Sequence, residues 1–242
     1  MGGMTGLLLL LWVGATMSAV VDLQKRIIGG HTCANTDRLY HVQLQYSNGG
    51  LLCGGSLISD QWILTAAHCL KVNMKAVVGV HPVDNKQKRT VGIQKSVIYP
   101  DSSQSHDIML LKLNERIVGI TPIKPPTDTD CNNLPKKKAP VQFAGHGPTA
   151  SGSTQASATL QCIDLTVDDC PGLKHLTYDN YYAKLLCGRT SGQVACPGDS
   201  GGGAVHGGII YGVFSRPTDC TQEPLFMDVC YYLKWITDEI KK

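Results

Sequence analysis

The chain has 242 residues, of which 43% are hydrophobic and 17% are charged, and its formal net charge is +3. This composition is typical of a folded globular protein and excludes a disordered, highly charged chain. The net charge is too small to indicate a nucleic-acid partner, and the basic run at residues 136–138 is interpreted as a solvated loop. The length allows one large β domain or two smaller ones.

The N-terminal segment has the features of a secretion signal. An apolar run from Leu7 to Val13 is followed by small residues as far as Ala19. The run is too short to cross a bilayer, so we predict a signal peptide over residues 1–19. Residues 20–26 then form a short predicted propeptide that ends in the basic pair Lys25-Arg26. No later segment is apolar enough for a membrane span, and we expect no membrane partner.

Beyond Ile27 the chain consists of short predicted strands separated by turns. Residues 42–46 alternate between apolar and polar side chains, as a half-buried strand does. Similar segments are found at 56–58, 62–64, 76–80, 97–98, 108–113, 141–144, 160–164, 209–214 and 226–229. Many short strands with glycine and proline turns predict an all-β barrel or sandwich.

One segment has a helical pattern. Leu233, Ile236 and Ile240 repeat at helical spacing, so residues 231–242 are predicted to form the one α-helix. A proline-rich connection over residues 121–135 is predicted to separate the two halves of the chain.

The ten cysteines indicate an oxidising compartment and a disulfide framework. Zinc is the competing interpretation, but the sequence contains no Cys-x2-Cys or His-x3-His pair, which argues against it. The spacing alone leaves the disulfide connectivity open.

Three motifs point to nucleophilic catalysis. Ser200 lies among glycines in residues 198–203, where the backbone can turn sharply and aim successive N–H groups at one spot. A serine hydroxyl needs a base to become a nucleophile. His68, in the motif of residues 64–69, provides one, and Asp107, in residues 106–111, lies between them in the sequence. Taken alone, the serine motif is more often a turn, the histidine a packed core residue and the aspartate a cap or turn. The occurrence of all three in one chain favours catalysis over coincidence.

The order His68, Asp107, Ser200, with Ile27-Ile28-Gly29-Gly30 ahead of it, resembles the chymotrypsin/trypsin family of serine proteases. The resemblance covers essentially the whole chain after Arg26. It implies an all-β fold of two six-stranded antiparallel β-barrels, with the active site between them and a C-terminal α-helix. Residues 27–242 would form this protease domain.

The resemblance also implies the catalytic roles. Ser200 would attack the scissile carbonyl, His68 would transfer the proton, and Asp107 would orient the imidazole. The backbone N–H groups of Gly198 and Ser200 would form the oxyanion hole. His106 would lie at the surface, because neighbouring strand residues face opposite ways.

The family pattern further implies activation by cleavage after Arg26, which would free the Ile27 ammonium to pair with Asp199. It pairs all ten cysteines, as Cys33–Cys162, Cys53–Cys69, Cys131–Cys230, Cys170–Cys187 and Cys196–Cys220. The partners would be a polypeptide substrate and an activating protease, with protein protease inhibitors as further candidates. The protein would be a secreted, extracellular or granule-stored monomer.

No metal or cofactor is expected. Trypsins hold calcium in a loop with carboxylate ligands, but the corresponding segment here, residues 79–91, is shorter. It carries Asp84 together with Lys86, Lys88 and Arg89.

The specificity pocket departs from the trypsin pattern. Val194, followed by Ala195, stands where trypsins have an aspartate, so a substrate cation would be buried without a partner. Ser215 is kept, but Arg216-Pro217 replaces the usual Trp-Gly, and proline cannot donate a backbone hydrogen bond. Two interpretations remain open: a secreted endopeptidase with apolar specificity, and a protease-fold binding or signalling protein with an obstructed pocket.

Overall fold

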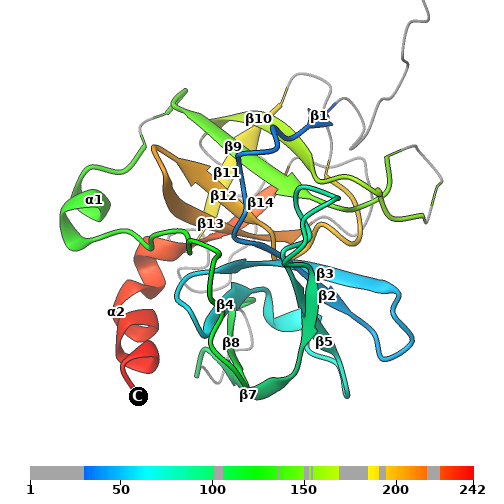
Figure 1. Ribbon diagram of the computed structural model, residues 1–242. Helices are drawn as coiled ribbons and strands as arrows, with labels where there is room; N and C mark the ends of the chain where they lie inside the picture. The colour runs from blue at the N-terminus through cyan, green and yellow to red at the C-terminus, as the bar shows by residue number, and fades with distance from the viewer. Residues whose placement is uncertain are drawn as a thin grey trace, which may run out of the picture.

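Two β-sheets, each rolled around its own core, contain most of the residues that the computed structural model describes (Figure 1). The described residues are 30–100, 106–135, 137–149, 153, 155–168, 185–190, 195–216 and 224–242. In Figure 1 the sheet from the N-terminal half lies below the sheet from the C-terminal half. The expected division into two β halves is confirmed.

The first sheet is a barrel that one bent strand closes. Its strands are β2 (His41–Gln45), β3 (Leu51–Leu57), β4 (Trp62–Thr65), β5 (Lys75–Val78), β6 (Arg89–Val91), β7 (Ile93–Ile98) and β8 (Met109–Leu113). They pair antiparallel in the order β6-β5-β2-β3-β4-β8-β7. Only Gly92 separates β6 from β7, yet these two strands lie at opposite ends of that order. A single bent stretch therefore pairs with β5 through its first half and with β8 through its second half.

The second sheet contains a closed ring of six strands. Its members are β1 (His31–Thr32), β9 (Pro140–Gly145), β10 (Gln161–Asp168), β11 (Leu185–Arg189), β12 (Gly203–His206), β13 (Ile209–Arg216) and β14 (Leu225–Asp228). Strand β10 pairs with both β9 and β11, which closes the ring, and β1 adds to its edge. Phe143, Phe214 and Phe226 pack together inside, with ring centroids 5.0–5.6 Å apart.

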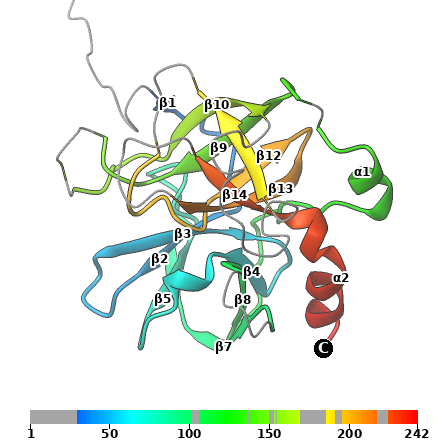
Figure 2. The ribbon, with the colours of Figure 1, turned by 180° about the vertical axis from the view of Figure 1, so that it is seen from behind.

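The C-terminal helix α2 (Val229–Ile240) confirms the predicted helix but begins slightly earlier. The Asp228 carboxylate accepts a hydrogen bond from the Cys230 N–H, so it caps the first turn. Tyr232 and Ile236 are buried in the same cluster as the first barrel's core. Figures 1 and 2 both show α2 running along the side of that barrel.

The structure adds a second α-helix that the sequence patterns did not predict. A short helix, α1 (Asp128–Asn132), lies in the proline-rich connection, because Thr127 and Asp130 exchange the hydrogen bonds of a capping box. A 3-10 turn, η1 (Ala67–Cys69), follows β4. Among the helices of the described residues, none has the length and apolarity needed to cross a bilayer.

Three of the five expected disulfides are confirmed: Cys33–Cys162, Cys53–Cys69 and Cys131–Cys230. Cys187 and Cys196 are also disulfide-bonded. Their expected partners, Cys170 and Cys220, lie outside the described residues, so those two pairings stay predictions.

A pair of buried histidines lies where the barrels meet. His41 begins β2 and His146 follows β9, and their ring centroids are 5.5 Å apart. Burial lowers the pKa of His146 from 6.5 to about 4, and it lowers the pKa of His41 well below 6.5. Nearby positive or titratable groups lower the pKa of His41 further: His146, Arg38 and His81. The hydrogen bond to the Ser157 carbonyl raises the pKa of His146, while His81 and Lys88 lower it, and burial has a larger effect than any of these three. Both rings are therefore neutral at neutral pH.

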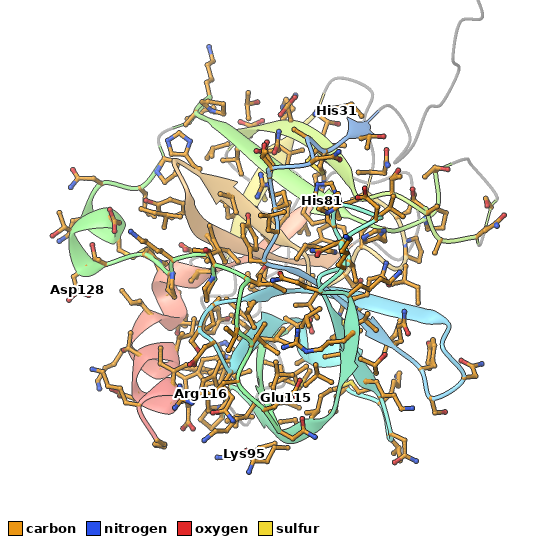
Figure 3. All side chains as sticks on the ribbon, viewed as in Figure 1. His31, His81, Lys95, Glu115, Arg116 and Asp128 are labelled. Atoms are coloured by element: carbon orange, nitrogen blue, oxygen red, sulfur yellow. A yellow bond between two sulfur atoms is a disulfide. The ribbon has the colours of Figure 1, made fainter. Side chains whose placement is uncertain are left out.

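His81, which affects both pKa values, lies on the side of the first barrel that faces the second. Lys95, Glu115 and Arg116 lie at the far end of the first barrel (Figure 3). His81 Nε2 is 2.8 Å from the Ala34 carbonyl oxygen. The Nε2 atoms of His41 and His146 are buried and have no hydrogen-bond partner within the described part of the chain. A proton added to either ring would have little compensation.

We expect acid to destabilise the fold through this pair. Because the folded-state pKa of His146 lies below that of the unfolded chain, its contribution is present above pH 6.5 and is lost as pH falls toward 4. At 1.36 kcal/mol per pKa unit, the loss amounts to about 3 kcal/mol for His146 alone. Urea unfolding between pH 4 and 7 measures it.

The control is a change that removes titration but keeps a polar side chain. His146→Gln should remove the contribution of His146 from the dependence of the free energy of unfolding on pH, whereas His31→Gln, at an exposed position in β1, should leave the wild-type slope. An unchanged slope in His146→Gln would contradict the assignment.

Candidate active site

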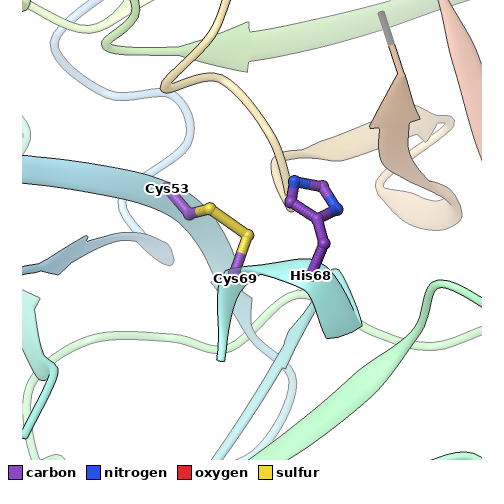
Figure 4. Close-up of side chains that lie close together, drawn as sticks. All are labelled: Cys53, His68 and Cys69. Carbon is purple, nitrogen blue, oxygen red and sulfur yellow. A yellow bond between two sulfur atoms is a disulfide. The ribbon is translucent and has the colours of Figure 1, made fainter. Parts of the chain in front are cut away.

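His68 is held by a disulfide beside it. It lies in η1, and the next residue, Cys69, is joined to Cys53 of β3 with an S–S distance of 2.03 Å. Figure 4 shows the His68 imidazole beside the Cys53–Cys69 disulfide. Potential ligand atoms of Cys53, His68 and Cys69 lie within 4.8 Å of one another. The joined sulfurs offer no thiolate, however, so this cluster does not suit a metal ion.

Asp107 receives hydrogen bonds from both barrels. Its Oδ1 accepts the backbone N–H of His68 at 2.8 Å, and its Oδ2 lies 2.7 Å from His68 Nδ1. The Ser215 hydroxyl of β13 donates to the same Oδ2 at 2.6 Å. Burial raises the pKa of Asp107, but the bonds from His68 and Ser215 outweigh it and hold the pKa below 3.8. Asp107 is therefore ionised at neutral pH, which places the imidazole proton on Nδ1 and a lone pair on Nε2.

Ser200 lies on a turn that is bonded across to the first barrel. Its carbonyl oxygen accepts the Gly54 N–H of β3 at 2.7 Å, and the residue is 8% exposed. The next residue, Gly201, has φ +80° and lies so close to β3 and β4 that a Cβ there would be 2.1 Å from Thr65 Oγ1. The structure thus brings the Ser200 turn against the strands that lead to His68.

Two backbone N–H groups of this turn are available as donors. Asp199 N–H donates to the Cys196 carbonyl, and Gly201 N–H donates to the Phe214 carbonyl. Gly198, at φ +99°, and Ser200 donate their N–H groups to no acceptor in the part of the chain that the structure describes. These are the two donors that the sequence predicted for an oxyanion hole.

The Asp199 carboxylate is fully buried beneath the same turn. It accepts the Gly147 N–H at 2.6 Å and the Cys196 N–H at 2.9 Å. Burial raises its pKa to about 7, although these two hydrogen bonds oppose the rise. Its predicted cationic partner, the Ile27 ammonium, lies outside the described residues.

The predicted pocket residues are only partly described. Ala195 is fully buried, and the backbone of Arg216 lies opposite Leu225 of β14. Val194 and Pro217 lie outside the described residues. Ser215, predicted as a pocket residue, uses its hydroxyl on Asp107. No local signal in the sequence points to that contact.

The prediction that His106 lies at the surface is wrong. The residue is 6% exposed, and its Nδ1 lies 2.8 Å from the Tyr232 hydroxyl of α2. Alternation along a strand does not apply to it, because β8 begins only at Met109.

Comparison with known proteins agrees with this geometry. The Trypsin family model matches residues 27–236, which is most of the chain. The chain belongs to the trypsin family. Serine protease 1 of Rattus norvegicus is 32% identical over 256 residues, which cover 98% of this chain and 99% of the relative. Kallikrein-2 of Homo sapiens is 31% identical over 258 residues, 94% of each chain.

A solved structure of a serine protease has the same fold. Neuropsin, a serine protease expressed in the limbic system of mouse brain, superposes with a TM-score of 0.76 at 26% identity. The match covers 87% of this chain and 98% of neuropsin. Family membership makes the chain a serine-type endopeptidase of the hydrolase class, with polypeptide substrates.

The tight contact at Gly201 can be separated from its backbone conformation. Gly208 has φ +79°, nearly that of Gly201, but nothing lies within 4 Å of a Cβ placed there. We expect Gly208→Ala to cost only the left-handed strain, about 1–2 kcal/mol. Gly201→Ala should cost several kcal/mol more or fail to fold. Urea unfolding of both variants measures the difference, and equal losses would contradict the close approach of the two barrels.

Proposed function

We propose that the chain is a secreted serine endopeptidase, made as a zymogen and activated by cleavage after Arg26. It hydrolyses peptide bonds through Ser200, His68 and Asp107, with apolar rather than tryptic specificity. The observation that carries the proposal is the 2.7 Å contact between Asp107 Oδ2 and His68 Nδ1. It leaves His68 Nε2 as the basic nitrogen, on an element that adjoins the Ser200 turn.

The steps follow from these proton positions. His68 Nε2 takes the proton of the Ser200 hydroxyl as its oxygen attacks the scissile carbonyl carbon, and it later gives that proton to the leaving amine. Asp107 stabilises the imidazolium that forms in between. A water molecule then gives a proton to His68 Nε2 and attacks the acyl-enzyme carbonyl carbon. His68 returns the proton to the serine oxygen, which releases the acid product and restores Ser200.

The N–H groups of Gly198 and Ser200 stabilise the negative charge that develops on the substrate's carbonyl oxygen. They bind the oxyanion of each tetrahedral intermediate, where the loss of one such donor costs about 2.7–4 kcal/mol of transition-state stabilisation. The neighbouring Pro197 has no N–H, but it lies outside this pair of donors.

Activation is proposed to depend on Asp199. A buried carboxylate whose pKa is raised to about 7 gains most from a nearby cation. Cleavage after Arg26 creates such a cation at Ile27, and the family match begins at that residue. Pairing of the Ile27 ammonium with Asp199 then orders the turn from Gly198 to Ser200. Secretion is supported by the predicted signal peptide and by the disulfides, which suit an oxidising compartment.

The test of the proposal is covalent labelling by a fluorophosphonate probe. The protein cleaved after Arg26 should be labelled at Ser200 and should hydrolyse peptides, whereas the uncleaved protein should be nearly inert. Ser200→Ala should remove labelling and lower turnover on the order of 10⁶-fold. Absence of labelling in the cleaved wild-type protein would contradict the proposal and favour a protease-fold binding protein. Equal labelling of the uncleaved protein would contradict the zymogen step.

Specificity is tested with a peptide library. Val194 offers no anion to a cationic side chain, so cleavage is expected after apolar residues such as Ala, Val or Leu, with Lys and Arg disfavoured. Discrimination among apolar residues should be loose, because one methylene is worth only about 1–3 kcal/mol. Val194→Asp is the matched variant and should gain cleavage after Lys and Arg. Dominant cleavage after Lys or Arg by the wild-type enzyme would contradict this assignment.

A further inference from the structure

His106, immediately before Asp107 in the sequence, is joined to the C-terminal helix. Its Nδ1 lies 2.8 Å from the hydroxyl oxygen of Tyr232 in α2. Both groups are buried: His106 is 6% exposed and Tyr232 is 0% exposed. A hydrogen bond between groups shielded from water is stronger than the same bond at the surface.

Aromatic rings hold this bond in place. The Tyr99 ring lies 4.7 Å from the His106 ring and 5.0 Å from the Tyr232 ring, measured between centroids. Tyr232 approaches His106 edge-on, with an angle of 87° between the ring planes. His106 is therefore fixed between the end of β7, where Tyr99 follows, and the first turns of α2.

Asp107 depends on what fixes its two flanking residues. On one side Ile108 is fully buried, its carbonyl oxygen accepts the Tyr99 N–H, and β8 follows. On the other side stands His106, whose Cα is about 3.8 Å from that of Asp107. The Asp107 carboxylate has acceptor distances of 2.6–2.8 Å to three donors. A small backbone displacement would therefore lengthen bonds to both His68 and Ser215.

We propose that His106 is a positioning residue: its hydrogen bond to Tyr232 couples the C-terminal helix to Asp107 and so sets the alignment of Asp107 with His68. The proposal rests on the proposed function of Asp107 and His68, since it concerns the same site. It gives α2 a role in turnover in addition to its role in covering the first barrel.

The test removes the Tyr232 hydroxyl alone. In the enzyme cleaved after Arg26, Tyr232→Phe should lower kcat about 3- to 10-fold, the effect of one lost hydrogen bond, with KM unchanged. A residue that only supports the fold would lower the stability of the enzyme without this loss of kcat at unchanged KM.

Matched variants isolate the bond. Tyr99→Phe deletes a hydroxyl from the same aromatic cluster, one that makes no hydrogen bond to His106 among the described residues, and should keep the wild-type kcat and KM. His106→Phe should reproduce the loss of Tyr232→Phe, and the double variant should lose no more than either single variant. Additive losses, or an equal loss in Tyr99→Phe, would overturn the proposal.

A readout without turnover separates this inference from the proposed function. In the Ser200→Ala protein, the His68 Nδ1 proton that faces Asp107 should give a low-field proton NMR signal, and Tyr232→Phe should shift that signal upfield. An unshifted signal would overturn the positioning role even in an active enzyme. A shifted signal in the Ser200→Ala protein, together with no fluorophosphonate labelling of the cleaved wild-type protein, would support the positioning role while contradicting the proposed activity.

Discussion

The structure depends most on the Asp107 carboxylate, because it receives donors from both barrels. His68 donates from the first barrel and Ser215 from the second, all at distances below 3 Å. An ionised group that is largely removed from water must be compensated by hydrogen bonds, or it will take up a proton. Movement of the two barrels apart would break part of that compensation. The same charge that orients the imidazole therefore also favours one relative position of the barrels.

Asp199 shows the opposite balance. It too is a buried carboxylate, but among the described residues its hydrogen-bond donors are two backbone N–H groups, and burial dominates its pKa. The hydrogen bonds from His68 and Ser215 keep Asp107 charged, whereas Asp199 would need a nearby cation to stay charged at neutral pH. Two aspartates close to the candidate active site thus differ in the stability of their charged forms, because their donors differ in number and kind.

Sequence patterns predicted strands and motifs, but they missed side-chain contacts between residues far apart in the sequence. Alternation predicted strands such as β2 and β13, and the order of three motifs predicted His68, Asp107 and Ser200. The contact of Ser215 with Asp107 spans 108 residues, and that of His106 with Tyr232 spans 126, so no local pattern encodes them. Short strands such as β6 and β12 were missed because their pairing partners, rather than their own propensity, make them strands.

The Cys131–Cys230 disulfide protects the chain against loss of a fragment when another protease cleaves it. It joins α1, in the connection between the barrels, to the first turn of α2 across a sequence separation of 99 residues. A single break of the backbone anywhere inside that span leaves both fragments covalently attached. Most of the second barrel, including Ser200, lies within the span. A single nick in this span therefore cannot by itself release a fragment, and the break would be detected only after the disulfide is reduced.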